Sequence, residues 1–432
     1  MKRVLIITYY WPPSGGNGVQ RWVKFAKYLR DFNWEPVVFT VSNGEYPVLD
    51  HSLVKDIPEG IEVIKHQIWE PYFLYKKFTG KKSDSKINRD VVGKNRKLSF
   101  TEKTALWLRG NIFIPDARKF WIKPSVKFLC NYLQSNPVDA IISTGPPHTD
   151  HLIALGIKKK LNIKWIADFR DPWTTMDYFN DLRLSSFAFK KHHRLELEVL
   201  RTADKVISVG SMMKKEFDEK RKSRTEIITN GFDREDFVTD EVNLSGEFSI
   251  VHIGSFLERR NPVSLWKALR ELISENTELK NKIKIKLIGR VEQSIFYSLK
   301  EYNLESYVES IPYMDHQKVI KEMKRSQVLL LPIDDFDGAK WVLTGKLFEY
   351  LAAKRPILCI GPQDGDAALV LAATKAGNTF DFDDVAGIKK QLLEYFNLYL
   401  QNKLQVNSSS IDNYSRKRLT QKLAGILNEI TA

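Results

Sequence analysis

Short apolar runs alternate with longer segments of helical periodicity along this chain, and this alternation constrains the fold more than any other feature. Six runs rich in β-branched residues lie in the N-terminal half, at 4–10, 36–41, 140–143, 164–168, 205–209 and 226–229. Six more lie in the C-terminal half, at 248–253, 283–288, 307–311, 328–332, 357–360 and 378–382. Continuous apolar runs are typical of strands buried on both faces, so the pattern predicts parallel sheets covered by helices.

A polar segment without periodicity, at 237–247, separates the two series of strands. We therefore expect an α/β chain with two doubly wound domains, at 1–238 and 246–405. A last amphipathic segment at 411–432 is predicted to form a helix that packs back across the N-terminal domain. With 432 residues, of which 43% are hydrophobic, the chain is long enough for two cores, and the composition excludes intrinsic disorder.

The net charge of the chain indicates an anionic partner but does not identify which kind. The sequence has 67 Lys and Arg against 53 Asp and Glu, a formal net charge of +14, which attracts nucleotides, nucleic acids or anionic lipids. Only two cysteines are present, Cys130 and Cys359, which argues against disulfide and zinc frameworks and favours reduced thiols in the cytoplasm. The apolar run at 4–10 stops at a Trp-Pro-Pro sequence, so we expect a strand there rather than a signal peptide.

An irregular insertion at 68–123 is rich in aromatic and basic residues. Between Lys76 and Lys103 it carries ten Lys or Arg and three Asp or Glu. Such a mixture suits an anionic membrane surface, to which the chain would bind peripherally because no apolar run is long enough to span a bilayer. A charged loop in water is an equal alternative.

A glycine-rich turn containing Gly15, Gly16 and Gly18 follows the first strand and precedes a helix predicted at 20–29. Glycines let a backbone approach a ligand closely, and the first amides of the helix are free to bind an anion. Neither the dinucleotide spacing GxGxxG nor the P-loop spacing GxxxxGK[ST] is present. The turn alone is therefore either a phosphate site or a tight connection.

Three segments together resemble the glycosyltransferases of family 4, in the capsule and lipopolysaccharide branch. They are the glycine turn, Asn-Gly-Phe-Asp at 230–233, and Gly-Lys-Leu-Phe-Glu-Tyr-Leu-Ala-Ala-Lys-Arg-Pro-Ile at 345–357. The resemblance covers essentially the whole chain. It implies the GT-B fold, in which two Rossmann-like domains face each other across a cleft. It also implies retaining transfer of a sugar from a nucleotide-diphosphate donor to a glycan or lipid-linked acceptor in surface polysaccharide synthesis.

The resemblance also implies a set of donor-binding residues. Breaking the bond between sugar and diphosphate leaves negative charge on phosphate, which cations and a helix N-terminus stabilise. Lys346 and Thr344 lie at the start of a helix predicted at 346–353, and Glu349 is suited to the ribose hydroxyls. The other donor-binding residues implied are the three turn glycines with Ser255, Arg259, Arg260, Arg290, Tyr313 and Trp341.

Two of these positions depart from the family pattern. Ser255 replaces an arginine that many members carry, and Trp341 replaces the first glutamate of a Glu-x7-Glu pattern that contacts the donor sugar. Asp335, Asp337 and Lys340 are alternatives for that contact. The aspartates also resemble a metal-binding DxD motif, but the family holds the diphosphate with protein cations, so we expect no required metal or other cofactor.

Two loops are expected to carry the acceptor chemistry. Ser-Thr-Gly-Pro-Pro-His at 143–148 and Asp-Phe-Arg-Asp-Pro-Trp at 168–173 each follow a strand, and related enzymes carry such segments near the reacting centre. The candidate catalytic residues are His148, Asp168 and Asp171, with the two aspartates as proton acceptors. The alternatives are a structural histidine and an ion pair between Asp171 and Arg170 that shapes the loop.

Two other functions remain open from the sequence. A nucleotide-sugar epimerase shares the two-domain architecture but acts on the donor alone. A nucleic-acid-binding protein would suit the net charge, but the sequence has no RNP-like, helix-turn-helix or zinc motif, so we expect no nucleic-acid partner.

Overall fold

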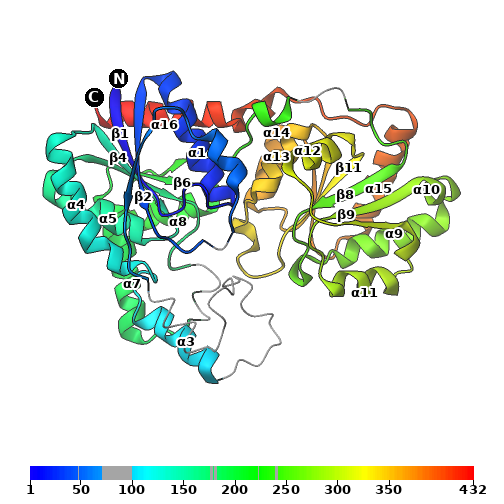
Figure 1. Ribbon diagram of the computed structural model, residues 1–432. Helices are drawn as coiled ribbons and strands as arrows, with labels where there is room; N and C mark the ends of the chain where they lie inside the picture. The colour runs from blue at the N-terminus through cyan, green and yellow to red at the C-terminus, as the bar shows by residue number, and fades with distance from the viewer. Residues whose placement is uncertain (47, 71–99, 176–178, 180–181, 222, 239–241) are drawn as a thin grey trace. The chain divides into compact units, whose positions relative to one another are not determined.

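The computed structural model describes residues 1–432 apart from 47, 71–99, 176–178, 180–181, 222 and 239–241 (Figure 1). The chain forms two compact units. Unit 1 consists of Met1–Thr229 with Arg416–Ala432, and unit 2 consists of Asn230–Ser415. The polar segment at which the sequence analysis divides the chain belongs to unit 2. Most of the basic stretch at 76–103 lies outside the described residues.

Unit 1 is built on a seven-stranded parallel sheet with the order β3-β2-β1-β4-β5-β6-β7. Its strands are β1 Lys2–Ile7, β2 Trp34–Val41, β3 Glu62–His66, β4 Ala140–Gly145, β5 Lys164–Phe169, β6 Lys205–Ser208 and β7 Glu226–Ile227. The described helices are α1 Asn17–Leu29, α3 Phe100–Asn111, α4 Ile122–Ser135, α5 Thr149–Leu161, α7 Ser186–Thr202, α8 Ser211–Arg221 and α16 Arg416–Ile430.

Unit 2 repeats this design with a six-stranded parallel sheet in the order β10-β9-β8-β11-β12-β13. Its strands are β8 Phe248–Ile253, β9 Ile283–Ile288, β10 Val308–Ile311, β11 Val328–Pro332, β12 Ile357–Ile360 and β13 Gly377–Phe380. Its helices are α9 Val263–Glu275, α10 Thr277–Lys282, α11 Gln293–Glu301, α12 His316–Arg325, α13 Gly345–Ala353, α14 Asp366–Thr374 and α15 Val385–Leu400. The predicted α/β class with two doubly wound sheets is confirmed.

Apolar side chains fill both faces of each sheet. In unit 2, one core contains Leu265 of α9 and Phe396 of α15, and the other contains Leu347 of α13 and Leu371 of α14. In unit 1, α1 and α16 cover one face together, and their side chains share an apolar cluster with Ile6 of β1 (Figure 1). The C-terminal helix is therefore an integral part of the unit 1 core.

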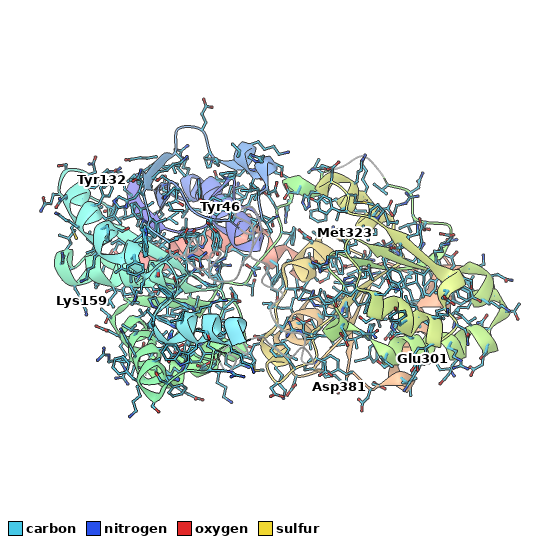
Figure 2. All side chains as sticks on the ribbon, turned by 60° about the horizontal axis from the view of Figure 1, so that its bottom comes forward. Tyr46, Tyr132, Lys159, Glu301, Met323 and Asp381 are labelled. Carbon is cyan, nitrogen blue, oxygen red and sulfur yellow. The ribbon has the colours of Figure 1, made fainter. Side chains whose placement is uncertain are left out.

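Polar contacts at the surface of unit 1 tie its helices to neighbouring elements. Tyr132 of α4 donates a hydrogen bond to Glu62 of β3, and Lys159 of α5 pairs with Glu198 of α7. Figure 2 shows Tyr132 and Lys159 at the outer side of the unit. In the described residues no helix is long and apolar enough to cross a membrane.

Two strand predictions differ from the structure, and each has a local cause. Strand β3 was not predicted, because exposed Glu62 and Lys65 flank only two apolar residues of this edge strand, so it lacks a continuous apolar run. The first strand ends at Ile7 and not at residue 10. The backbone N–H of Tyr9 leaves the ladder and donates to Asp150 Oδ2 over 2.9 Å.

Candidate functional site

The carboxyl ends of the parallel strands gather most of the residues that the sequence singles out. Ligands bind at this edge in open α/β sheets, because loops there open away from the covering helices. Unit 1 brings its glycine turn, His148, Asp168 and Asp171 to this edge, and unit 2 brings Arg260 and Lys346.

The glycine turn of unit 1 is shaped by close contacts. Gly16 has a φ of 107°, a conformation that side chains other than glycine rarely adopt. A Cβ at Gly18 would overlap the guanidinium of Arg170, which also donates to the carbonyl of Pro146. The turn therefore leads into α1 as predicted, and Gly18 leaves room for an arginine from the loop after β5.

Asp168 lies inside unit 1 and not at its surface. The side chain is fully buried, and it accepts hydrogen bonds from Thr144 Oγ1 over 2.9 Å and from Trp22 Nε1 over 3.2 Å. Its main partner is Arg21, whose Nη2 donates to Oδ1 over 2.8 Å. Arg21 Nε donates to Oδ2 over 3.3 Å as well. Four donor groups thus saturate this carboxylate, and its role as a proton acceptor stays a prediction.

Arg21 was not predicted as a site residue, although it organises this edge. Its guanidinium is fully buried and donates to the carbonyls of Ile228 and Thr229 over 2.9 and 2.6 Å, besides its bonds to Asp168. An arginine that serves three chain segments at once holds α1, β5 and the end of the unit together. Its only signal in the sequence is that it lies four positions, about one helical turn, before Phe25 of the apolar face of α1.

His148 is the most unusual polar side chain of this edge. It is 4% exposed and stacks on Trp173, with ring centroids 4.5 Å apart and an interplanar angle of 1°. Both of its ring nitrogens lack a hydrogen-bond partner in the described part of the chain. Burial, followed by the charge of nearby His151, lowers its pKa well below the usual value. A neutral imidazole with two unused nitrogens is suited to a ligand hydroxyl.

The loop that carries Asp171 is anchored by a buried carboxylate. Glu196 of α7 is 1% exposed and accepts hydrogen bonds from the N–H and Oγ1 of Thr174, over 3.2 and 2.7 Å. Lys220 of α8 pairs with the same carboxylate over 2.7 Å. Asp171 itself is partly exposed and lies close enough to Arg170 to raise the pKa of that arginine, which burial lowers overall.

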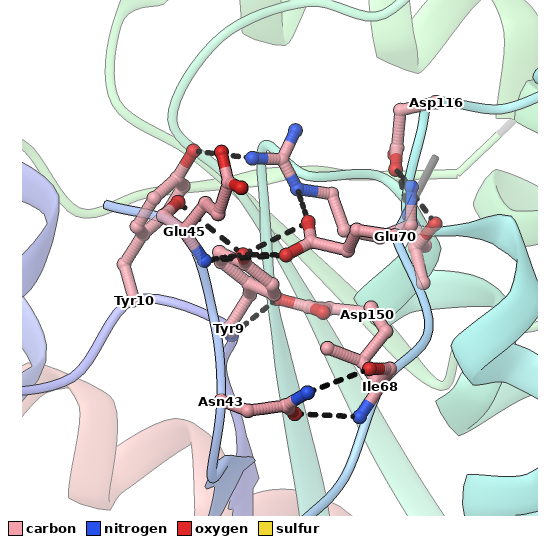
Figure 3. Close-up of polar contacts among 10 residues, drawn as sticks. Tyr9, Tyr10, Asn43, Glu45, Ile68, Glu70, Asp116 and Asp150 are labelled. Carbon is pink, nitrogen blue, oxygen red and sulfur yellow. Dashed lines mark hydrogen bonds and ion pairs between the residues drawn. The ribbon is translucent and has the colours of Figure 1, made fainter. Parts of the chain in front are cut away.

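A second polar cluster lies beside the glycine turn (Figure 3). Glu70 accepts hydrogen bonds from Tyr9 Oη over 2.9 Å and pairs with Arg118 Nε over 3.2 Å. Asp116 accepts from the N–H of Thr149 over 3.0 Å at the start of α5. This network connects residues near the two ends of the 68–123 insertion. Burial raises the pKa of Glu70, because its carboxylate is partly desolvated there.

At the edge of unit 2, two glycines pack back to back. Gly254 follows β8 with a φ of 108°, and Gly289 follows β9 with a φ of 114°. A Cβ at Gly289 would lie 2.9 Å from the carbonyl oxygen of Gly254, and a Cβ at Gly254 would overlap the amino group of Lys346. The ammonium of Lys346 therefore lies directly on bare backbone.

Lys346 is a cation in an unfavourable place. Burial and the positive charge of Arg260 lower its pKa to about 8, although Glu349 and Asp334 act in the opposite direction. Its ammonium makes no hydrogen bond or ion pair with any described residue. A cation in the first turn of α13 is also opposed by the helix dipole. All three effects would be relieved by an anion.

The start of α13 offers further anion-binding groups. Thr344, the N-cap residue, makes no capping bond, and its buried Oγ1 has no partner in the described chain. No acidic residue occupies the first turn of the helix. The helix is fixed one turn later, where the N–H of Ile253 donates to Tyr350 Oη over 3.1 Å. Tyr350 was not predicted, although it lies inside the quoted motif.

Arg260 faces the same edge but has a partner. Its Nε and Nη2 form two hydrogen bonds with Asp334, over 2.8 and 3.1 Å, so the guanidinium is held in place. It also donates to the carbonyl of Ser255 over 3.3 Å. Residue 255 is a serine and not the arginine of the family pattern. This loop therefore has one positive charge fewer, and residue 255 contacts Arg260 through its backbone.

His252 is a residue of this edge that the sequence analysis passed over. It is 2% exposed on β8, its Nδ1 lies 3.2 Å from the carbonyl oxygen of Leu330, and its Nε2 has no partner in the described chain. Burial and the charge of Lys346 lower its pKa to about 3, so the imidazole is neutral. The sequence signal for this residue is that His252 interrupts the apolar run of a predicted strand.

The remaining predicted donor residues lie on loops at the same edge. Ser255, Arg259 and Arg290 are exposed, Tyr313 is 86% exposed, and Trp341 is partly buried at the end of a short 3-10 turn. Glu349 is partly buried on α13, close enough to Lys346 to raise the pKa of that lysine. Lys340 pairs with Asp364, and Asp335 and Asp337 are exposed. In the described residues no three His, Cys, Asp or Glu side chains cluster as a metal site requires.

No protein-family model and no curated protein matches this sequence, but solved structures do. Sucrose-phosphate synthase from Thermosynechococcus elongatus is 11% identical over 99% of each chain, with a TM-score of 0.62. TarM of S. aureus, solved as a variant with UDP, is 12% identical over 99% of this chain and 100% of that chain, with a TM-score of 0.61. A putative UDP-N-acetylglucosamine 2-epimerase from Listeria monocytogenes is 10% identical over 99% of this chain and 96% of that chain, with a TM-score of 0.54.

These likenesses extend over both units of the chain. At such low identity they show the fold, which is the two-domain α/β fold of GT-B type that the sequence predicts. A protein described as a putative epimerase and a sucrose-phosphate synthase share it, so fold alone does not decide the reaction.

Proposed function

We propose that this protein is a glycosyltransferase whose nucleotide-diphosphate sugar donor binds at the carboxyl edge of the unit 2 sheet. One observation carries the proposal: the ammonium of Lys346 lies on the bare backbone of Gly254, beside Arg260, and forms no ion pair with a described carboxylate. A diphosphate at this place would supply the missing negative charge. Unpartnered Thr344 Oγ1 and the free amides of α13 would supply donors.

The same groups suit the chemistry of transfer. When the bond between sugar and diphosphate breaks, charge accumulates on the leaving phosphate, and fixed cations stabilise it more than they stabilise the ground state. Arg260 is held rigid by Asp334, and α13 is held by Tyr350, so little reorganisation is needed during the reaction. Glu349 is assigned to the ribose hydroxyls, and Arg290, Tyr313 and Trp341 to the nucleoside and sugar.

We assign the acceptor chemistry to unit 1 on the sequence resemblance. The acceptor hydroxyl would belong to a glycan or a lipid-linked glycan in surface polysaccharide synthesis, and the transfer would retain the anomeric configuration. In such a reaction the leaving phosphate itself can take the proton. His148 would then hydrogen-bond the sugar or acceptor, and Asp171 would orient the hydroxyl. We expect a cytoplasmic enzyme that needs no metal and that contacts the membrane through 76–103.

Donor binding is the direct test. Calorimetric titration with UDP, GDP, dTDP and their sugars should identify one nucleotide series that binds. Lys346→Ala should weaken that binding by about 100-fold, since a charge-assisted contact to phosphate contributes about 1.5–3 kcal/mol. Lys267→Ala, on the exposed face of α9, is the matched control and should bind as the wild type does. Unchanged binding in Lys346→Ala would remove the site.

Product analysis separates transfer from epimerisation. The donor that binds is incubated with and without a panel of glycan acceptors, and the products are identified by mass spectrometry and NMR. A new glycosidic bond that appears only with an acceptor supports the proposal, and Glu349→Ala should lose most of that activity while the fold survives. An isomerised sugar nucleotide formed without acceptor would identify an epimerase instead.

A further inference from the structure

Unit 1 exposes large aromatic side chains on elements that come from separate parts of the sequence. Trp107 of α3 is 44% exposed, Phe120 of the 3-10 turn Lys119–Trp121 is 40% exposed, and Phe187 at the start of α7 is 73% exposed. Figure 1 shows α3 and α7 together at the end of this unit that lies away from α16. Exposed aromatic groups of this size mark interaction surfaces in soluble proteins.

Contacts join these side chains into one surface. Trp69 meets Phe120 with ring centroids 4.8 Å apart, and Lys119 lies 5.0 Å from the centre of the Phe120 ring. Asn111 at the end of α3 accepts a hydrogen bond from the N–H of Ser185 over 2.7 Å, which fixes α3 beside the start of α7. We call this surface the aromatic-basic face; its residues are Trp69, Trp107, Lys119, Phe120, Phe187 and Lys191.

Positive charge is interleaved with the aromatic rings. Lys191 lies 6.0 Å from the centre of the Phe187 ring, and its charge, after burial, lowers the pKa of Lys119, so the two lysines approach each other. Between Arg183 and Arg194 the sequence has four Lys or Arg and no Asp or Glu. The positive charges of neighbouring lysines repel each other, and an anionic partner would remove this repulsion.

We propose that the aromatic-basic face binds the surface of an anionic lipid bilayer. Aromatic rings prefer the interface between headgroups and acyl chains, and lysines beside them reach anionic headgroups. The charge argues against a second copy of this chain, because a symmetric dimer would place the lysines of one face against those of the other. The lack of acids from Arg183 to Arg194 gives no site for a basic protein partner.

This surface is distinct from the basic stretch at 76–103, and it does not depend on the proposed function. It consists of described residues on α3, α7, the 3-10 turn Lys119–Trp121 and the loop after β3, and all of it belongs to unit 1. A chain that binds no nucleotide could still carry it. If both hold, the face would keep the enzyme on the membrane that carries a lipid-linked acceptor.

Vesicle flotation with the full chain tests the proposal. The wild type should float with phosphatidylcholine vesicles that contain phosphatidylglycerol, and less with phosphatidylcholine alone. Lys119→Gln with Lys191→Gln should lower partitioning about 25-fold, because each lysine near an anionic surface contributes about fivefold. Phe120→Ser with Phe187→Ser should lower it at least about tenfold, through lost apolar burial.

The controls are matched in chemistry and lie on α11 of unit 2. Tyr297 is 66% exposed and Lys300 is exposed, so Tyr297→Ser and Lys300→Gln remove comparable groups elsewhere and should float as the wild type does. Nucleotide titration of all variants should be unchanged, which separates failure of this proposal from failure of the donor site. Unchanged flotation of the face variants would overturn the proposal. The proposal would also be overturned if the wild type did not bind vesicles and instead formed a concentration-dependent dimer, or bound RNA, in a way that Phe187→Ser abolishes.

Discussion

Unit 1 and unit 2 each hold a desolvated cation at the carboxyl edge of the sheet, fully buried Arg21 and partly buried Lys346, but the surroundings of the two differ. In unit 1, Arg21 faces Asp168 and two backbone carbonyls, so its charge and donors are satisfied within the chain. In unit 2, Lys346 faces a second cation and bare backbone, and its pKa falls to about 8. The first arrangement holds the fold together, whereas the second leaves a desolvated cation whose charge a diphosphate would balance on the proposed function.

The largest effect is expected when Arg21 loses its partner Asp168. Asp168→Asn should destabilise unit 1 by about 3–5 kcal/mol, because Arg21 would remain buried without its counter-charge. Lys346→Met should leave the stability of unit 2 unchanged or raise it, since it removes a desolvated cation that has a like charge beside it. Urea unfolding followed by tryptophan fluorescence reports mainly on unit 1, which holds eight of the ten tryptophans.

A surface pair provides the control for the buried one. Lys417 pairs with Asp31 over 2.7 Å with both side chains about half exposed, so Asp31→Asn should cost no more than about 1 kcal/mol. Replacing both members of the buried pair, with Arg21→Met and Asp168→Leu, should recover part of the lost stability. A midpoint for Asp168→Asn close to that of Asp31→Asn would mean that the buried pair does not hold the unit.

The next effect in size concerns the space around Lys346 and leaves every charge in place. Gly254→Ala should weaken nucleotide binding by roughly tenfold to 100-fold, because its Cβ would displace the ammonium and its φ of 108° is strained for alanine. Gly246→Ala is the control, since an added Cβ there meets no atom within 4 Å. Both variants are measured by nucleotide titration. Wild-type affinity in Gly254→Ala would show that Lys346 is not held against this backbone by a bound anion.

The fold was largely predictable because burial of strands leaves a direct trace in sequence. Eleven of the twelve predicted runs overlap by three or more residues with a parallel strand, and the run at 226–229 overlaps with a two-residue strand. Strand β3 was not predicted because exposed Glu62 and Lys65 leave only a short apolar run at the edge of the sheet. The end of β1 escaped because a long-range bond to Asp150 decides it, and periodicity does not carry such information.

The site was predictable in part, because motif spacing names residues but not their surroundings. Lys346 and Thr344 lie at the start of α13, near Arg260, whereas their binding of a donor stays a prediction. Spacing could not show that Asp168 is saturated by four donors, nor that Arg21 is its partner. Nor could it show that Tyr350 fixes α13, since that bond depends on how the helix packs on β8.

The smallest of the expected effects is a pH dependence that belongs to unit 2. The pKa of Lys346 is about 8 in the free protein, and a bound diphosphate would raise it. Nucleotide affinity should therefore be constant below pH 8 and fall above it, by at most about tenfold per pH unit, as the free site loses its proton. Phosphate groups with a second pKa of about 6 are already fully ionised in this range and add no slope.

The same group makes the opposite contribution to the stability of the free protein. The pKa of Lys346 in the folded state lies below the ordinary lysine value of 10.5, so between about 8 and 10.5 the unfolded chain binds more protons and folding becomes more favourable as the pH rises. Lys346→Met should lose both slopes, the fall in affinity and the rise in stability, whereas Lys267→Ala should keep both. An affinity profile that stays flat to pH 10 in the wild type would mean that the ammonium does not meet the nucleotide. The cation would then be a desolvated structural lysine, and the contrast with Arg21 would lose its functional meaning.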